Sequence, residues 1–377
     1  MNLSELVTPA LVLDRKILDV NISRLHERMK ALGVDLRPHG KTAKNIDVIR
    51  MALAGQSGGI TVSTLKEAEY YFANGIRDIV YAVGIAPVKL DRICALIKKG
   101  ADITVILDSM AQVRFVAEKA RSQNLEIPVL VELDCDGHRS GVTLDDSLLL
   151  DIGRLAEREE GVILKGVLTH AGESYSCKSV EAIRALAAVE RDVAVQAATR
   201  LRENGLPCPV VSVGSTPTAN FAEDLSGVTE VRAGVFVFYD LVMAGLGVCK
   251  PGDIAVSVLA SVIGHQKKKG WTIIDAGWMA LSRDRGTAAQ KVDQGYGLVY
   301  DLDGNPVGEL IVSSVNQEHG IIEPRTGTAT DGERFEVGDM VRILPNHACA
   351  TAAMHDRYQV VDGGMEVIDT WHRTNGW

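Results

Sequence analysis

The chain has 377 residues, of which 46% are hydrophobic and 24% charged, and its formal net charge is −9 at pH 7. These values are typical of a globular protein long enough for two domains. The negative charge argues against nucleic acid or an anionic membrane as a partner, because either would require a basic patch. The apolar runs are too short to span a bilayer, and the N-terminus does not resemble a signal peptide. Six dispersed cysteines without a CxxC pattern indicate a reduced, cytoplasmic chain.

Eight short apolar runs alternate with helix-length segments over the first two thirds of the chain. The runs are 34–39, 59–63, 78–83, 102–107, 128–133, 164–169, 209–213 and 230–238. Between them, segments such as 65–74 and 180–204 carry apolar residues at helical spacing. This alternation predicts a parallel (β/α)₈ barrel, with an open doubly wound sheet as the alternative.

After about residue 250 the pattern changes to strands separated by turn signals. The strand-like runs are 257–264, 271–275, 297–301, 308–313, 340–344, 358–362 and 365–371. No helix-length periodic segment lies between them, so we expect a separate all-β domain. The early run 10–13 is compatible with either domain.

Polar residues follow the ends of the predicted barrel strands, where barrel enzymes carry their chemistry. Lys41 follows the first strand. If the barrel buried its ammonium, that group would have to be paired, deprotonated or covalently bound, and burial would make it a usable nucleophile. The alternative is that Lys41 caps the strand and points into solvent. The other candidates at strand ends are Ser63, Thr64, Arg139, His170, Tyr175, Gly214, Ser215, Thr216, Tyr239 and Asp240.

The loop 213–218 after the seventh strand offers backbone N–H groups and hydroxyls, which suit a phosphate group. The amides near Gly234 would add further donors from the eighth strand. Because turns use the same residue types, the position of the loop in the barrel is what favours a phosphate site.

A second candidate site lies in the predicted β domain. His347 and Cys349 are separated by one residue, and in an extended segment their side chains would project to the same side. An imidazole and a thiolate suit zinc or another divalent first-row metal, with open positions left for substrate. The alternative is a core cysteine beside a hydrogen-bonded histidine.

Four motifs occur in a familiar order: 37–42 (RPHGKT), 213–216 (VGST), 316–320 (NQEHG) and 345–349 (PNHAC). Together they resemble the fold-type III, pyridoxal-phosphate- and metal-dependent D-amino-acid enzymes. This group holds D-serine dehydratase, D-threo-3-hydroxyaspartate dehydratase and D-threonine aldolase. The resemblance spans essentially the whole chain, and the stretches 134–141, 166–172 and 275–287 are most similar to the hydroxyaspartate dehydratase branch.

The resemblance implies an alanine-racemase-like barrel at 15–249, a β domain made of 1–14 and 250–377, and a homodimer. It implies pyridoxal 5'-phosphate held covalently by Lys41, and a divalent metal held by His347 and Cys349. Zinc is favoured for the metal, with magnesium, manganese and cobalt as alternatives. The remaining cofactor-binding residues would be Arg139, Tyr175, Gly214, Ser215, Thr216 and Gly234, and the candidates for contacting substrate are Gln317, His319 and Arg283.

The implied function is dehydration of a β-hydroxy D-amino acid to a 2-oxo acid and ammonia. D-threo-3-hydroxyaspartate is the preferred substrate and D-serine the second. Position 349 is cysteine, which is the dehydratase pattern, whereas the aldolases of the group carry an aspartate two residues after the histidine. A retro-aldol enzyme, a racemase and a non-catalytic cofactor carrier are the alternatives. A racemase would need a second acid or base that no residue here identifies, and a carrier would need neither the β domain nor the metal pair.

Overall fold

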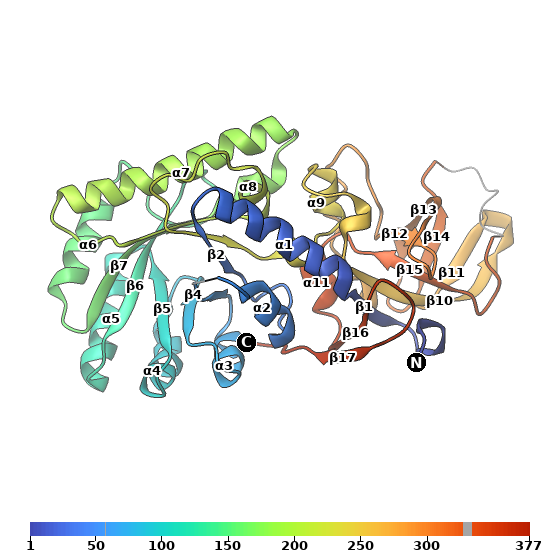
Figure 1. Ribbon diagram of the computed structural model, residues 1–377, viewed down its shortest axis with the longest axis horizontal. Helices are drawn as coiled ribbons and strands as arrows, with labels where there is room; N and C mark the ends of the chain where they lie inside the picture. The colour runs from blue at the N-terminus through green and yellow to red at the C-terminus, as the bar shows by residue number, and fades with distance from the viewer. Residues whose placement is uncertain (57, 327–333) are drawn as a thin grey trace. The chain divides into compact units, whose positions relative to one another are not determined.

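A computed structural model describes residues 1–56, 58–326 and 334–377. The chain forms two compact units. We call Arg24–Gly234 with Thr374–Trp377 the barrel unit, and Met1–Ser23 with Val235–Arg373 the β unit. The domain bounds expected from the sequence stay a prediction. Figure 1 shows the helices and strands of both units and labels most of them.

The barrel unit is built on an eight-stranded parallel sheet. Its strands are β2 (Asp35–Pro38), β3 (Ile60–Val62), β4 (Asp78–Tyr81), β5 (Asp102–Leu107), β6 (Ile127–Leu133), β7 (Val162–Thr169), β8 (Val210–Val213) and β9 (Glu230–Ala233). Strands that follow one another in the chain are neighbours in the sheet, and β9 returns to pair with β2. A parallel bridge between His39 and Thr61 joins β2 to β3 and closes the barrel. The predicted (β/α)₈ barrel is therefore confirmed.

Helices alternate with these strands. They are α1 (Arg15–Ala31), α2 (Ile46–Leu53), α3 (Leu65–Ala73), α4 (Leu90–Lys98), α5 (Met110–Gln123), α6 (Leu148–Arg158), α7 (Val180–Glu203) and α8 (Thr216–Phe221). Local chemistry fixes several ends: the side chains of Thr64 and Ser179 accept backbone N–H groups in the first turns of α3 and α7. Gly75 and Gly205 follow the last turns with φ of +93° and +73°, which glycine adopts without strain.

The barrel also contains a buried charged network that joins β2, β8 and β9. Glu230 accepts hydrogen bonds from Arg37 Nε at 2.6 Å and from Ser212 Oγ at 2.6 Å. The hydroxyl of Ser212 in turn accepts a bond from Arg232 Nη1 at 2.6 Å. These bonds compensate charges that would otherwise be buried without partners.

The β unit holds a nine-stranded sheet. Its strands are β1 (Ala10–Asp14), β10 (Val256–Gln266), β11 (Trp271–Ile274), β12 (Leu298–Tyr300), β13 (Pro306–Val315), β14 (Gly320–Pro324), β15 (Met340–Leu344), β16 (Arg357–Val361) and β17 (Asp369–His372). Strands β11, β14, β13, β12, β15 and β10 form a closed antiparallel ring, because β10 pairs with both β15 and β11. Strand β1 pairs with β10 and β16, so the early run 10–13 belongs to this sheet. The predicted strands of the β domain are found; β14 was not predicted.

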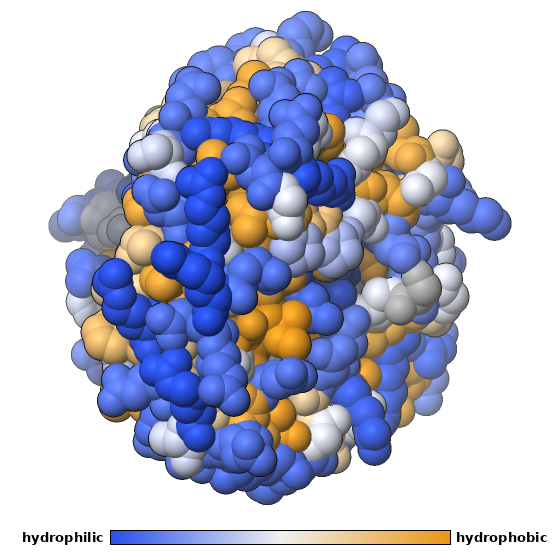
Figure 2. All heavy atoms as spheres, turned by 90° about the vertical axis from the view of Figure 1, so that its left-hand side faces the viewer, coloured by the Kyte–Doolittle hydropathy of each residue, from blue (hydrophilic) through white to orange (hydrophobic). Residues whose placement is uncertain are grey.

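Three short helices complete the β unit: α9 (Leu241–Gly245), α10 (Trp278–Leu281) and α11 (Ala348–Ala352). The face of the molecule in Figure 2 is mainly hydrophilic, with apolar side chains scattered in small groups. No helix in the described part of the chain is long and apolar enough to cross a membrane. None of the six cysteines, all within the described part of the chain, forms a disulfide bond.

Candidate active site

Lys41 lies three residues beyond the end of β2. The backbone there is held by two hydrogen bonds, from Gly40 N to Thr61 O at 2.8 Å and from Lys41 N to His39 Nδ1 at 3.3 Å. The side chain of Lys41 is exposed. The interpretation that the barrel buries its ammonium is therefore wrong, because the residue follows the strand and does not form part of its interior face. What distinguishes Lys41 is its neighbourhood.

Two histidines near Lys41 are neutral. The ring of His170 bonds Gly214 O through Nδ1 at 2.9 Å, and because a carbonyl only accepts, Nδ1 carries the proton. Burial lowers the pKa of His170 to about 3, with the hydrogen bond to Gly214 O opposing this and the charges of Lys41 and Arg232 contributing to it. Burial and the same two charges hold the pKa of His39 well below its usual range. The ring of Tyr175 lies 6.2 Å from that of His170, centroid to centroid.

Arg232, on β9, was not among the predicted site residues. Its side chain is 5% exposed, and its Nη2 donates to Thr169 O at 2.5 Å. Burial lowers its pKa to about 10, although Glu230 and Glu190 favour the charged form. The sequence offers little signal for such a residue, since an arginine in a strand usually reaches solvent.

The loop after β8 contains a buried hydroxyl to which no described residue is hydrogen-bonded. Ser215 Oγ caps α8 by accepting the backbone N–H of Thr218 at 3.2 Å, and it also contacts Ser174 Oγ at 2.9 Å. Thr216 is 1% exposed, and its Oγ1 has no hydrogen-bond partner among the described residues. A buried hydroxyl left unsatisfied destabilises a protein unless a ligand or water completes it. Thr216 therefore fits an acceptor such as a phosphate oxygen.

Gly214 has a different part in this loop. Its N–H donates to Glu190 Oε1 at 3.0 Å, and the same oxygen accepts the N–H of Ala171 at 2.9 Å. Glu190, from α7, is buried, which raises its pKa, and it ties the loops after β7 and β8 together. Gly214 has a φ of +136°, and a Cβ there would lie 2.2 Å from Arg232 O. The position thus requires glycine, and its amide is engaged within the protein.

Gly234, beyond β9, lies against the segment that carries Lys41. A Cβ at this position would be 3.0 Å from Thr42 Oγ1 and 3.2 Å from His39 Cβ. The absence of a side chain allows this close approach.

Arg139 lies in the loop after β6. Its side chain is 58% exposed, and its Nη2 is 3.6 Å from the buried Glu132 Oε1. Burial raises the pKa of Glu132, whereas the charge of Arg139 lowers it. The guanidinium is therefore loosely held and accessible.

The metal candidates lie in the β unit. We expected an extended segment, but only His347 is extended (φ −135°, ψ 104°), while Cys349 lies in the first turn of α11. The extended prediction is wrong because β15 ends at Leu344 and a helix begins at Ala348. The helical turn still brings the two side chains within hydrogen-bond reach of each other. Among the described residues, no group of three or more His, Cys, Asp or Glu side chains forms a metal cage.

Asp284 orients the imidazole of His347. The distance from His347 Nδ1 to Asp284 Oδ2 is 2.7 Å, and Asp284 Oδ1 accepts the N–H of Gly286 at 2.8 Å. Burial lowers the pKa of His347, but Cys349 and Asp284 outweigh it and raise the pKa to about 11. The hydrogen bond from His347 lowers the pKa of Asp284. A carboxylate on one ring nitrogen leaves the other for a metal, which is a common arrangement around zinc.

Asp240 fixes the start of α11 from within the same unit. It is 1% exposed, and its carboxylate accepts the N–H of Ala348 at 3.0 Å and that of Met243 at 2.9 Å. We predicted Asp240 as a polar residue at a barrel strand end. Its contacts instead hold the turn that carries the two metal candidates.

The three substrate candidates surround α10 in the β unit. The Cζ of Arg283 lies 4.0 Å from the centroid of the Trp278 ring. The backbone of α10 bonds the turn between β13 and β14, where Met279 N donates to Gln317 O at 3.2 Å. The side chains of Arg283, Gln317 and His319 are exposed. Thus the cofactor candidates all lie in the barrel unit, and the metal and substrate candidates all lie in the β unit.

Two family models match the chain. The model "Alanine racemase, N-terminal domain" matches residues 13–241, and "Putative serine dehydratase domain" matches residues 255–361. Among curated proteins, the D-threo-3-hydroxyaspartate dehydratase of Delftia sp. (strain HT23) is 53% identical over 98% of both chains. The D-serine dehydratase of Dictyostelium discoideum is 30% identical over 100% of this chain and 98% of its own.

Solved structures agree with these matches. The structure of the Delftia dehydratase has a TM-score of 0.98 and covers 100% of both chains. A cysteine-to-alanine variant of a D-threo-3-hydroxyaspartate dehydratase, solved in the metal-free form, is 52% identical, with a TM-score of 0.97 and full coverage of both chains. A D-threonine aldolase from Filomicrobium marinum is 26% identical, with a TM-score of 0.82 over 99% of this chain and 96% of its own.

Proposed function

Because the chain belongs to the alanine-racemase-like family that includes D-threo-3-hydroxyaspartate dehydratase and D-serine dehydratase, we propose that it is a dehydratase of β-hydroxy D-amino acids. D-threo-3-hydroxyaspartate would give oxaloacetate and ammonia, and D-serine would give pyruvate and ammonia. The observation that carries this proposal is the 53% identity to the Delftia enzyme over 98% of both chains. On the same family grounds we propose a homodimer and a cytoplasmic location.

The barrel unit has the features required to hold pyridoxal 5'-phosphate. Thr216 Oγ1 is a buried donor without a partner among the described residues, so we assign it to the phosphate, with Ser215 and the backbone near Gly234 beside it. Gly214 would not donate to the phosphate, because its N–H is bonded to Glu190; its role would be to allow a backbone turn that has no room for a side chain. Arg139 and Tyr175 would approach the ring, since both are exposed at strand ends. When bound, the cofactor supplies an electron sink for charge that develops at Cα.

Lys41 has two proposed tasks. Its exposed Nζ would hold the cofactor covalently, and once released it would take the proton from Cα of the substrate. The neutral His170 cannot repel that amine, because its Nδ1–H is committed to Gly214 O and its Nε2 carries a lone pair. The same neutrality makes His170 a poor acid, which argues against a second proton donor for racemisation.

We propose that His347 and Cys349 hold a divalent metal, with zinc favoured for an imidazole and thiolate pair. The metal-free form of the related dehydratase supports metal use in this family. Asp284 would keep Nε2 of His347 directed at the ion. When bound, the ion supplies Lewis acidity for a hydroxyl leaving group.

Arg283 is the candidate for the second carboxylate of hydroxyaspartate. It has no carboxylate partner among the described residues, whereas its neighbour Arg285 is paired with Asp293 at 2.6 Å. The exposed Gln317 and His319 would add hydrogen bonds nearby. A guanidinium stacked on an indole is pre-organised for carboxylate binding.

The test is product analysis on purified enzyme. A panel of β-hydroxy D-amino acids should yield equal amounts of ammonia and 2-oxo acid, and chelation should abolish both while added divalent metal restores them. Release of glycine and an aldehyde would identify an aldolase, and inverted substrate a racemase. Absence of turnover on every member of the panel would favour a cofactor carrier.

A further inference from the structure

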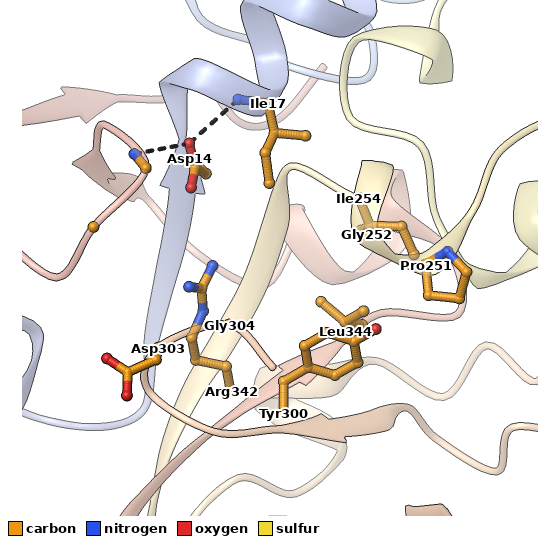
Figure 3. A pocket seen from close by; sticks show the side chains of 12 residues that line it. Asp14, Ile17, Pro251, Gly252, Ile254, Tyr300, Asp303, Gly304, Arg342 and Leu344 are labelled. Atoms are coloured by element: carbon orange, nitrogen blue, oxygen red, sulfur yellow. Dashed lines mark hydrogen bonds between the residues drawn. The ribbon is translucent and has the colours of Figure 1, made fainter. Parts of the chain in front are cut away.

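The β unit contains a small pocket that shares no residue with the candidate active site. Its volume is about 110 Å³, and Asp14, Tyr300 and Arg342 contribute polar groups to its wall (Figure 3). Four glycines, Gly252, Gly304, Gly363 and Gly364, also line it and add no side chains to the space. The space corresponds to roughly four water molecules, which is also the size of a small amino acid.

Arg342 presents an unused guanidinium face to this pocket. The residue is 7% exposed on β15, and its Nε donates to Ser257 Oγ at 3.0 Å. Nη1 and Nη2 have no hydrogen-bond partner in the described part of the chain. The guanidinium points towards Asp14 in Figure 3, and a Cβ on Gly304 would lie 3.4 Å from Nη1. Burial lowers the pKa of Arg342, opposed by the charges of Asp14 and Asp301.

Asp14 faces the same pocket, and only one of its two carboxylate oxygens is hydrogen-bonded to a described residue. It is 6% exposed, and its Oδ1 accepts the N–H groups of Lys16, Ile17 and Gly363 at 3.0, 3.3 and 3.2 Å. Its Oδ2 accepts no hydrogen bond from any described residue. No ion pair within 4.0 Å joins Asp14 to Arg342 in the described chain, so a gap separates two buried, opposite charges.

We propose that this pocket binds a small zwitterionic α-amino acid. Its carboxylate would accept two parallel bonds from Nη1 and Nη2 of Arg342, and its ammonium would donate to Asp14 Oδ2. A simple anion would face the carboxylate of Asp14, a simple cation would face Arg342, and an apolar molecule would satisfy neither. A dipolar ligand satisfies both at once.

The size and lining of the pocket narrow the class of amino acid. A volume of about 110 Å³ admits glycine, alanine or serine and excludes aromatic side chains. Tyr300 is 8% exposed, and its hydroxyl forms no hydrogen bond with a described residue, so it is available to a polar side chain. This site is independent of the proposed dehydration, and the ligand stabilises the β unit because it binds only the folded state.

Glycine is the probe for this site, because it has no β-hydroxyl to eliminate. Binding to the holoenzyme is measured by titration calorimetry and by thermal unfolding, while visible absorbance reports any binding at the cofactor. We expect saturable glycine binding that leaves the visible spectrum unchanged and raises the melting temperature. Acetate and methylammonium, each carrying one of the two charges, should bind at least roughly tenfold more weakly.

Variants locate the binding. Asp14→Asn keeps an oxygen for the N–H groups of the first turn of α1 but removes the charge, and it should weaken glycine binding roughly tenfold or more without changing turnover. Arg342→Lys should do the same, because lysine lacks the planar fork. Asp303→Asn, an exposed carboxylate at the same pocket, is the matched control and should change little.

Three outcomes would overturn the proposal. The first is no glycine binding beyond that seen in the visible spectrum. The second is acetate binding as tightly as glycine, which would make this an anion site. The third is spectrally silent binding that Asp14→Asn leaves intact. The comparison of glycine with acetate and methylammonium uses the unaltered protein, so it decides the matter even if a variant fails to fold.

Discussion

The two groups of candidate residues are built in opposite ways. In the barrel unit, Lys41, Arg139, Thr216 and Gly234 come from four different strand ends, and closure of the sheet brings them to one end of the barrel. In the β unit, His347 and Cys349 are neighbours on a single turn, and contacts from elsewhere in the chain only orient them.

Because of this difference, the cofactor candidates and the metal candidates should respond differently to substitution. The cofactor candidates in the barrel unit are positioned by many hydrogen bonds, such as those that Glu190 accepts from the N–H groups of Ala171 and Gly214, so their arrangement does not depend on one contact. The metal pair depends on two side chains and on the hydrogen bond from His347 to Asp284. We therefore expect substitutions at Lys41 and Thr216 to leave metal binding intact, and substitutions at Cys349 and Asp284 to leave cofactor binding intact.

The largest effect is expected at Lys41. Lys41→Ala should reduce turnover at least about 1,000-fold and abolish the visible absorbance of the covalently held cofactor, because both proposed tasks use Nζ. Absorbance spectra and ammonia release measure the two losses. Lys44→Ala is the matched control, since Lys44 is paired with Glu67 at 3.2 Å. An unchanged spectrum in Lys41→Ala would refute the assignment.

Cys349→Ala should come next, with turnover at least about 100-fold lower and the cofactor absorbance retained. The reason is that alanine leaves His347 as the single protein ligand. Metal content measured by emission spectroscopy should fall in parallel. Cys94→Ala, a buried cysteine on α4, should keep its metal. Full elimination activity in metal-free Cys349→Ala would contradict the Lewis-acid role.

Asp284→Asn should weaken metal binding about 10- to 100-fold, because the imidazole of His347 loses the carboxylate that orients it. Metal titration of the stripped enzyme gives the affinity, and excess metal should restore most of the turnover. Asp293 lies on the same loop but pairs with Arg285, so the Asp293→Asn variant is the control and should bind metal normally. Equal affinity in the two variants would remove Asp284 from the account.

Thr216→Val should weaken binding of the cofactor roughly tenfold, since the buried hydroxyl is assigned to the phosphate. Dialysis followed by cofactor titration measures the change, and metal content should stay constant. Thr216→Ser keeps the hydroxyl and should bind normally. If valine binds the cofactor as well as threonine does, the phosphate lies elsewhere.

The last prediction concerns the pH dependence of stability. His170 has a pKa of about 3 in the folded protein, against about 6.5 in the unfolded chain, so the unfolded chain binds more protons between these values. Stability from this group is therefore present above about pH 6.5 and lost as the pH falls towards 3. His170→Asn should reduce that loss, measured by urea unfolding at about pH 7, 5 and 4. The exposed His138 provides the control, and an unchanged slope would argue against a neutral, half-buried His170.

The fold was largely predictable because most strands and helices are indicated by residues within or next to their own segments. Each barrel strand is a short apolar run, and several helices carry their own capping residue, such as Thr64 or Ser179. Strand β14 was missed because it is only five residues long and begins with Gly320 and ends with Pro324, two residue types that are depleted in strands.

The candidate site was predictable only where its residues share a motif or a strand end. Arg232 and Glu190 were missed because their partners are 20 or more positions away in the chain or on another element. Asp284 was not predicted, because in the sequence it lies between Arg283 and Arg285 and far from His347. Only the folded chain brings it to the imidazole. The helical turn at Cys349 was missed because the motif is short enough to suit a strand as well.

The most direct test of the separate roles of Lys41 and the metal uses the Cys349→Ala variant. It follows cleavage of the Cα–H bond and loss of the β-hydroxyl in the same substrate. D-serine is incubated with this variant in D₂O, and exchange of the Cα proton is recorded by NMR beside release of ammonia. The account predicts that exchange continues, because Lys41 is intact, while ammonia release is lost together with the metal. Loss of exchange and elimination together, or retention of both, would contradict it.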